Sequence, residues 1–448
     1  MNSFFGEIQY FLSIYWNYDF EEFWKLYIVI FPFVIFVEIP LYMLIIGAYL
    51  NKFWKDVFTP PIQPNYYPDV SCIITCYNEG EAIVATLRSL VEQIYKGNIE
   101  ILVVIDGANV NKPTYNAAQS YAIKYHSEFK NTGRYIKVIP KGQRGGRVSS
   151  NNLGLSLAKG EILIIIDGDC SVDNDLVSSA IRGFADKNVV ASSGNIRVRN
   201  TDASLVAKFQ AIEYMVGLQL SKTGLAELGM LNNISGAHGI FRKSFIKAIG
   251  GWKNGTAEDL DMTTRIKAYL KQYPHLRIIH SYEATMHTDV PETWGKLLKQ
   301  RLRWDGDLSF LYFRRYRKIL RPKNIGWKNL FAIIWYDLIF GLCVPFLTIA
   351  YTIWLFFNFS PSFGATMLIL TYIYYLFSAI VLFFLYLVFV SERKGNDLKF
   401  IIYLPLMPIY NYIMRTWTAV ATIFELVLST HKDTSMAPWW VIKKTHCL

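Results

Sequence analysis

The chain has 448 residues, of which 52% are hydrophobic, 16% aromatic and only 18% charged. This composition, with a mean hydropathy of +0.21, predicts a membrane protein that carries a water-soluble part. The formal net charge of +11 accompanies long apolar runs, so we attribute it to basic residues beside a membrane and expect no nucleic-acid partner. The five cysteines are scattered and odd in number, which argues against a disulfide framework.

Residues 1–57 are predicted to form an N-terminal membrane unit. Within it, residues 24–50 are apolar and long enough to cross a bilayer, although Glu38 and two prolines lie inside this segment. Lys52 follows at once, which predicts that the C-terminal end of the segment is cytoplasmic. Residues 5–16 are rich in aromatic side chains and are expected to lie along the membrane interface.

A water-soluble α/β domain is predicted for residues 58–290, a range that begins with a proline-rich linker at 58–68. Short apolar runs alternate here with helix-like segments, a pattern typical of a mostly parallel sheet. The runs that we assign to strands are 70–75, 99–106, 135–140, 161–167 and 189–194.

The run ILIIIDGDC at 162–170 indicates a binding site at the end of a strand. Its apolar residues predict a fully buried strand. Asp167 and Asp169 then lie at the carboxyl end of that strand, where open parallel sheets bind ligands, and Gly168 allows a tight turn between them. Two carboxylates this close suit a divalent cation that holds a phosphate. An ordinary Asp-Gly turn is the alternative interpretation of this stretch.

The C-terminal part contains further membrane segments. Residues 291–328 are basic and aromatic, include QRLRW at 300–304, and are predicted to lie on the membrane surface. Apolar blocks at 329–357 and 364–390 are predicted spans, and the block at 400–428 fits either one kinked span or a re-entrant pair. These blocks make up a predicted membrane domain, 329–428, and the tail 429–448 is a candidate gating segment.

Three more stretches carry groups suited to chemistry. The run ILVVIDG at 101–107 repeats the strand-then-aspartate pattern and places Asp106 at a strand end. The stretch 142–154 is glycine-rich and basic, as a phosphate-binding loop would be, although its spacing is not that of a P-loop. Acidic residues at 258, 259 and 261 begin a predicted helix, where a simple preference of acidic side chains for helix N-termini is the alternative explanation.

The order of these motifs resembles that of the processive, membrane-embedded family 2 glycosyltransferases, which include hyaluronan, chitin, cellulose and poly-N-acetylglucosamine synthases. The resemblance covers residues 70–305 closely and implies a GT-A type domain flanked by transmembrane helices. For the donor, it implies that Tyr77, Glu79 and Asp106 bind the uridine, that Arg147 and Asp167 bind the nucleotide, and that Asp169 binds Mg²⁺ or Mn²⁺. It implies that Asp259 is the catalytic base, beside Glu258, and that Ser235, Gly236 and His238 bind the acceptor. Gln300, Arg303 and Trp304 match the QxxRW motif. Arg147 stands where many members carry lysine.

The resemblance further implies an inverting, metal-dependent transfer of sugar from a UDP-sugar to a growing β-linked polysaccharide, coupled to its secretion. The chain would then be a multi-pass protein of the cell membrane with a cytoplasmic catalytic domain, and an accessory secretion subunit is compatible with it. Ionisable and aromatic residues inside the C-terminal spans would line the polymer path. The candidates are Trp335, Tyr336, Asp337, Tyr412, Arg415 and Trp417.

Two alternatives remain at this point. A non-processive enzyme that adds one sugar to a lipid-linked acceptor shares the same catalytic motifs. A membrane transporter or receptor with a nucleotide-sensing domain is a different class, but it assigns no role to Asp259 or to QRLRW. The identity of the sugar, and whether the polymer alternates, stay open.

Overall fold

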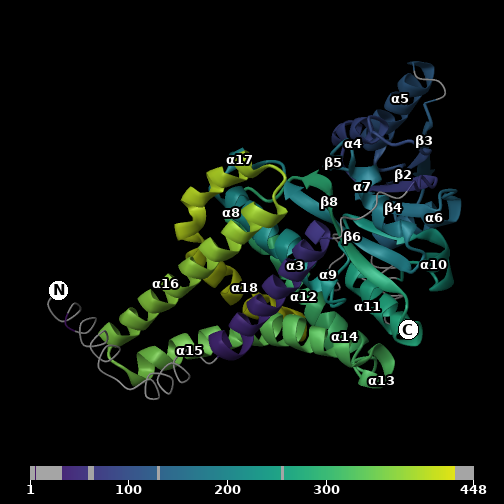
Figure 1. Cartoon of the computed structure of the whole chain (residues 1–448). Helices are drawn as coiled ribbons and strands as arrows, with labels where there is room; N and C mark the ends of the chain where they lie inside the picture. The colour runs from purple at the N-terminus through teal and green to yellow at the C-terminus, as the bar shows by residue number, and fades with distance from the viewer. Residues whose placement is uncertain (1–5, 7–32, 59–64, 129–131, 254–256, 429–448) are drawn as a thin grey trace.

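The computed structural model describes residue 6 and residues 33–58, 65–128, 132–253 and 257–428. An α/β domain with one large sheet lies at one end of the molecule, and long helices extend away from it at the other (Figure 1). The predicted interfacial segment at 5–16 and the tail at 429–448 fall almost wholly outside the described residues.

The sheet has eight strands in the order β3-β2-β1-β4-β7-β6-β8-β5. Their bounds are β1 Val70–Cys76, β2 Ile99–Asp106, β3 Arg134–Lys141, β4 Ile162–Asp167, β5 Ser171–Val172, β6 Val189–Val198, β7 Gly239–Arg242 and β8 Arg277–Thr288. The pairs β3-β2, β2-β1, β1-β4 and β6-β8 are parallel, whereas β7 runs antiparallel to both of its neighbours and β5 runs antiparallel to β8. The sheet is therefore mixed, with a parallel half that contains the strand ending in Asp167.

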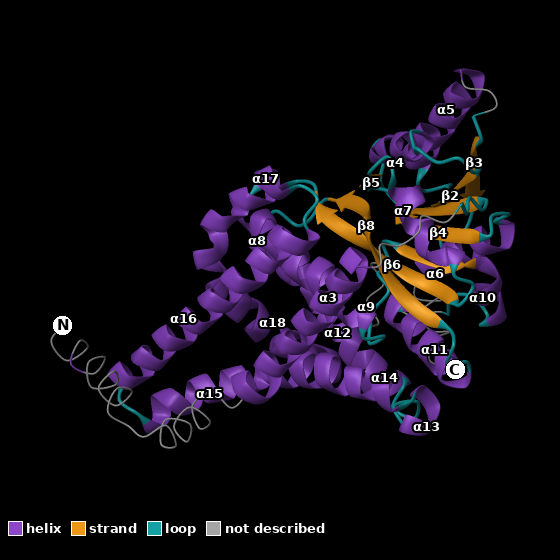
Figure 2. Ribbon diagram, in the orientation of Figure 1, coloured by secondary structure: helices purple, strands orange, loops and turns teal. Residues whose placement is uncertain are grey.

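Helices of the α/β domain cover both faces of this sheet (Figure 2). Their bounds are α4 Ala82–Val91, α5 Lys112–Glu128, α6 Gly146–Leu157, α7 Leu176–Arg182, α8 Leu205–Glu213, α9 Lys222–Glu227, α10 Lys243–Ala248 and α11 Glu258–Gln272, with short turns η2 Gly183–Ala185, η3 Thr201–Ala203 and η4 Tyr214–Ser221.

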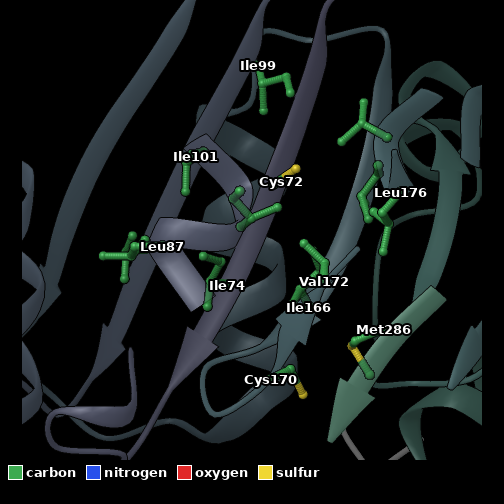
Figure 3. Packing of buried hydrophobic residues seen from close by; sticks show 14 of the residues in the cluster. Cys72, Ile74, Leu87, Ile99, Ile101, Ile166, Cys170, Val172, Leu176 and Met286 are labelled. Carbon is green, nitrogen blue, oxygen red and sulfur yellow. The ribbon is translucent and has the colours of Figure 1, made fainter. Parts of the chain in front are cut away.

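Alternate residues of the parallel strands pack into two separate hydrophobic cores, one on each face of the sheet. Cys72 and Ile74 of β1 pack under α4, α5 and α7 together with Ile166 of β4. Figure 3 shows these three side chains with Leu87 of α4 and Leu176 of α7. Ile73, between them in the sequence, packs on the opposite face against α6, α10 and α11. Because both faces are covered, the strands are apolar at almost every position, which is why the parallel strands could be predicted from the sequence.

The remaining helices form the part of the molecule beyond the sheet. Their bounds are η1 Val34–Glu38, α3 Ile39–Phe58, α12 Trp294–Phe310, η5 Leu311–Arg315, α13 Pro322–Ile325, α14 Trp327–Ala332, η6 Ile333–Cys343, α15 Val344–Asn358, α16 Pro361–Leu385, η7 Tyr386–Val390, α17 Lys394–Asp397, η8 Leu398–Leu406 and α18 Met407–Leu428. The side-chain hydroxyl of Thr293 accepts a hydrogen bond from the Lys296 amide and so caps α12.

Three helical segments among the described residues are long and apolar enough to cross a membrane. They are Val34–Lys55, Trp327–Asn358 and Pro361–Val390, and an 18-residue window in each has a mean hydropathy of 1.8, 2.1 and 2.5, respectively. Large apolar side chains such as Phe357 and Phe377 are exposed on them, as expected for helices that face lipid. The third C-terminal block, in contrast, divides near Pro405 into η8 and α18. The helix α18 packs against α12 and also against α15 and α16 of the candidate spans.

Strands were found at all five stretches that the sequence predicted, with ends that differ by a few residues. The sequence analysis missed β5, β7 and β8. β5 and β7 have two and four residues, too few to show a periodic pattern, and β8 contains polar residues such as His280 and Glu283. These missed strands carry the antiparallel pairings of the sheet, so the predicted parallel character applies to only part of it.

Candidate active site

A cavity of about 710 Å³ lies where the carboxyl end of β4 meets the first turns of α6 and α11, the helix α12 and the segment η6. We call it the large cavity. Ten of the sequence-predicted site residues line it: Arg147, Asp167, Asp169, Ser235, Gly236, Glu258, Asp259, Gln300, Arg303 and Trp304. The fold therefore brings residues from five separate stretches of the sequence to one space.

The loop of Asp167 and Asp169 is anchored from behind by two other elements. The Thr86 hydroxyl, on α4, donates to the carbonyl oxygens of Gly168 at 2.8 Å and Cys170 at 2.5 Å. A Cβ at Gly168 would meet the Cys76 sulfur at 2.8 Å. The glycine is thus required by a close approach of the loop to β1, whereas its φ is not among the positive ones. The reason differs from the tight turn that the sequence had indicated.

Arg147 lies between acidic groups that come from different elements. Its guanidinium is 2.6 Å from Asp167 and 3.2 Å from Glu258, and it donates to the Gly236 carbonyl oxygen at 2.5 Å. Burial raises the pKa of Glu258 to about 7, although Arg147 acts in the opposite direction. Arg147 therefore links the carboxyl end of β4 to the start of α11.

Asp259 lies at the start of α11 and its carboxylate is held from three sides. One oxygen accepts hydrogen bonds from the Asn233 side-chain amide at 3.2 Å and from the Gly236 backbone amide at 3.3 Å. The other accepts from the Leu260 amide at 2.8 Å. These donors fix the direction of the carboxylate toward the large cavity. A carboxylate placed in this way can accept a proton from a hydroxyl that enters the cavity.

The QRLRW stretch forms part of α12 and contributes one wall of the large cavity. Gln300, Arg303 and Trp304 all line the large cavity, and Trp304 is 38% exposed, so its ring is open to a ligand. Arg301, within the same motif, pairs with Glu213 at 2.8 Å and lies over the Trp304 ring at 4.9 Å. Aromatic faces next to a cation are suited to a sugar ring and a charged leaving group.

Four predicted site residues lie outside the lining of the large cavity: Tyr77, Glu79, Asp106 and His238. Asp106 accepts hydrogen bonds from the amides of Gly145 and Gly146, both at 2.9 Å, and pairs with Lys141 at 2.6 Å. It therefore anchors the glycine loop that carries Arg147. Tyr77 is exposed beside this loop, with the Arg144 guanidinium 4.0 Å from its ring centre.

His238 is fully buried and packs where a Cβ on Gly194 would come within 2.2 Å of its ring. Its Nδ1 lies 3.1 Å from the Asn195 carbonyl oxygen, so Nδ1 carries the proton in this contact. Burial lowers the pKa of His238 to about 4, and the ring is neutral near pH 7. This is a packing position behind the cavity wall.

Sequence reasoning missed several residues of the large cavity. Lys222 at the start of α9 lines it, and burial lowers the pKa of this lysine to about 8. Asn232 and Asn233 also line it, in the stretch NNISG just before the predicted SGAHG. The two adjacent asparagines ahead of a glycine turn could have been recognised in the sequence as candidate site residues. Nothing in the sequence around Lys222 marks it as one.

Two of the six residues proposed to line a polymer path, Tyr336 and Asp337, line the large cavity. Asp337 accepts hydrogen bonds from the Tyr312 hydroxyl at 2.5 Å and from the Asn232 amide at 3.1 Å. Arg415 instead pairs with Glu38 at 2.6 Å, and the Trp417 ring donates to the Leu298 carbonyl oxygen at 2.8 Å. The cavity thus reaches the candidate span Trp327–Asn358 about one third of the way along it.

The acidic residues of the large cavity fit a hard divalent cation. Burial raises the pKa of Asp167, and the charge of Asp169 acts in the same direction, so a nearby cation would relieve the cost of both charges. Among the described residues no cluster of three or more His, Cys, Asp or Glu side chains forms a metal site. The protein would supply one or two carboxylates and leave the other positions to phosphate and water, as is usual for Mg²⁺.

Comparisons with known proteins identify the family of the chain. Residues 71–249 match the glycosyl transferase family 2 and residues 162–391 match the glycosyl transferase family group 2. The poly-beta-1,6-N-acetyl-D-glucosamine synthase of Staphylococcus aureus (strain COL) is 28% identical over 282 residues, 62% of this chain and 64% of that protein. The synthase of the same name from Staphylococcus epidermidis is 29% identical over 258 residues, 57% of this chain and 58% of that one.

A solved structure shares the fold. It is the mannosyltransferase PcManGT from Pyrobaculum calidifontis in complex with GDP-Man and Mn²⁺, with a TM-score of 0.52 and 18% identity over 87% of this chain and 97% of that chain. The chain spans less than two thirds of the length of the two staphylococcal synthases. One family match nevertheless covers just over half of the sequence and includes β4, α11 and the QRLRW helix, so the chain belongs to the family 2 glycosyltransferases.

Proposed function

We propose that this chain transfers a sugar from a UDP-sugar to the end of a growing β-linked polysaccharide, with inversion at the anomeric carbon, and that it moves the product across the membrane. The observation that carries the proposal is the extent of the large cavity. It runs from Asp167 and Asp169 past Asp259 to Trp304, and it ends at Asp337 of a candidate span.

In this scheme Asp259 accepts the proton of the acceptor hydroxyl as the hydroxyl oxygen attacks the anomeric carbon. The bond to the diphosphate breaks on the opposite side, which gives a β-linkage from an α-linked donor. Arg303 and Arg147 lie where they can offset the charge that develops on the departing diphosphate. Asp167 and Asp169 would hold Mg²⁺ or Mn²⁺, which supplies further electrostatic stabilisation of that leaving group when bound. A single base is enough for a direct displacement.

The staphylococcal relatives make UDP-N-acetylglucosamine the first donor to test. Purified full-length chain is mixed with UDP-N-acetylglucosamine, UDP-glucose, UDP-glucuronic acid or GDP-mannose, each with Mn²⁺, with Mg²⁺ and with EDTA. Nucleotide release and the mass of the product are measured. We expect release from a UDP-sugar that depends on the metal, and a ladder of long products.

Two results would change this proposal. Products that carry one added sugar, on a lipid, would favour the non-processive enzyme. Undiminished synthesis in excess EDTA would remove the metal from the reaction. Asp169→Ala gives a second check, since we expect it to weaken nucleotide binding in the presence of Mn²⁺.

A further inference from the structure

A second cavity, of about 550 Å³, lies outside the active site between the β6 and β8 strands, helix α8 and the segment α17–η8. We call it the basic cavity. Five Lys or Arg side chains and two Asp side chains line it. Neither the proposed transfer reaction nor any motif of the sequence analysis assigns a role to this cavity.

The cations of the basic cavity divide into two sets. The three arginines are paired: Arg197 with Asp397, Arg199 with Asp289 at 2.7 Å, and Arg393 with Asp173 at 2.7 Å. The two lysines, Lys208 and Lys399, form no ion pair with any residue that the structure describes. Lys208 lies 5.5 Å from the centre of the Tyr403 ring instead. The cavity therefore offers the positive charge of two lysines beside an aromatic wall, offset in part by the exposed Asp202, which also lines it.

One apolar side chain that lines this cavity, Ile402 of η8, is 68% exposed. Leu398 and Ile401 of the same segment, next to lining residues in the sequence, are 52% and 48% exposed. η8 follows directly after the candidate span that ends at Val390 and the short helix α17. A basic pocket with an apolar rim at the end of a membrane span lies at the depth of lipid headgroups.

Arg199 of the basic cavity contacts two residues that line the large cavity. The Arg199 guanidinium donates to the Asp169 carbonyl oxygen at 3.0 Å and to both carboxylate oxygens of Asp289, at 2.9 and 2.7 Å. Asp169 and Asp289 both line the large cavity. A negative group bound in the basic cavity would attract Arg199 and so act directly on the loop that carries Asp169.

We propose that the basic cavity binds the phosphate headgroup of an anionic phospholipid and that the bound headgroup modulates activity through Arg199. The free lysines supply the charge, the Tyr403 wall and the η8 rim supply contacts for the glycerol and acyl regions, and Arg199 supplies the link. The assignment of lipid as the source of the phosphate rests on the apolar rim, because a soluble phosphate compound would not need it.

The first test measures binding without catalysis. Full-length protein in detergent is titrated with dioctanoyl phosphatidylglycerol, and bound lipid is counted by native mass spectrometry. Wild type should bind phosphatidylglycerol in preference to dioctanoyl phosphatidylcholine. The double variant K208Q/K399Q should bind it roughly thirtyfold more weakly, since each lysine near a membrane surface contributes about a fivefold share. Because this readout does not require turnover, its failure is distinguishable from failure of the proposed function.

A matched control removes two exposed lysines that precede a candidate span but lie outside the basic cavity, in the variant K318Q/K323Q. This variant should keep the affinity of wild type. Equal loss in both double variants, or no preference of wild type for phosphatidylglycerol, overturns the proposal. The preference of wild type remains a test even if K208Q/K399Q does not fold.

Two further experiments test whether the phosphate belongs to a lipid and whether its binding changes activity. Glycerol phosphate, the headgroup without acyl chains, should bind much more weakly than phosphatidylglycerol, and equal affinity would replace the lipid with a soluble ligand. Nucleotide release should differ between vesicles with and without phosphatidylglycerol for wild type and K318Q/K323Q. The difference should vanish in K208Q/K399Q, and a difference that persists there would overturn the coupling through this cavity.

Discussion

Asp259 is positioned by donors that come from outside its own helix. Asn233 and Gly236 hold one carboxylate oxygen, so the group cannot rotate away from the cavity without losing two hydrogen bonds. A base that is held in this way needs little reorganisation when the acceptor hydroxyl arrives. The geometry thus gives a physical reason for a role that the sequence assigned by resemblance alone.

We predict that Asp259→Asn lowers polymer synthesis by roughly 10²- to 10⁴-fold, the usual loss when a general base is removed. The affinity for UDP should change little, because the amide keeps the size of the carboxylate. Turnover is followed by UDP release and affinity by calorimetry. Asp175→Asn is the control, since Asp175 is exposed and lies outside the large cavity. Wild-type turnover in Asp259→Asn would show that another group is the base.

His238 gives a prediction about pH. The unfolded chain binds a proton on this residue near the ordinary pKa of 6.5, but burial lowers the pKa in the folded protein to about 4. As the pH falls through that window the folded state loses stability, by about 3 kcal/mol in all. His238→Asn should remove this part of the pH dependence, which is read from unfolding temperatures between pH 8 and pH 4.

The same variant also tests the predicted role of His238 at the acceptor site. A packing role leaves the Michaelis constants for donor and acceptor near those of wild type at pH 7.5. A large rise in the acceptor constant alone would instead support the contact that the resemblance implied. His280→Asn is a useful comparison, because His280 is also buried and burial lowers its pKa to about 3.

At the scale of elements, a buried polar network connects three helices around the membrane side of the large cavity. Lys267 of α11 donates to the Asn232 side-chain oxygen at 2.6 Å, and Asn232 donates to Asp337 of η6 at 3.1 Å. Tyr312 of η5 donates to the other Asp337 oxygen at 2.5 Å. The helix α11, the segment η5 that continues the QRLRW helix, and a candidate span are thereby held in one arrangement, so the spans can influence the geometry of the large cavity.

We predict that Tyr312→Phe destabilises the protein by about 1–3 kcal/mol, because it leaves a buried carboxylate oxygen without its donor. Turnover should fall more than the affinity for UDP, since Asp167 and Asp169, which we propose to bind the donor phosphates, lie at the other end of the cavity. Thermal unfolding in detergent and UDP release measure the two effects. Tyr135→Phe removes an exposed hydroxyl from β3 and should change neither quantity. An unfolding temperature equal to that of wild type would show that the network is not important for stability.

At the scale of the whole molecule, the large cavity and the candidate spans together make a prediction about transport. The purified chain alone, reconstituted into sealed vesicles with its active site outside, should build polymer that accumulates in the lumen. Lumenal polymer is protected from an added glycan hydrolase, whereas polymer left outside is digested. Complete digestion would contradict coupled transport, and a requirement for a second protein would point to an accessory subunit.

Local patterns in the sequence determined much of the architecture. The buried strands, the aspartates at the end of β4, the acidic start of α11 and three of the predicted apolar segments were all predictable, because each depends on neighbours within about twenty residues. The functional class followed from the order of the motifs. The division of the last apolar block at Pro405 also had a local signal in its prolines, although the sequence left its outcome open.

Only the tertiary structure decided what these groups contact. Arg147 forms ion pairs with both Asp167 and Glu258, although these two acidic residues are 91 positions apart in the sequence (258 − 167). Arg415 pairs with Glu38, which is 377 positions away. Asp106 and Asp167 both end buried strands, yet one is enclosed by the glycine loop and the other faces the cavity. Such differences arise from packing between distant segments, which no local pattern records, because burial and hydrogen-bond partners are set only when the chain has folded.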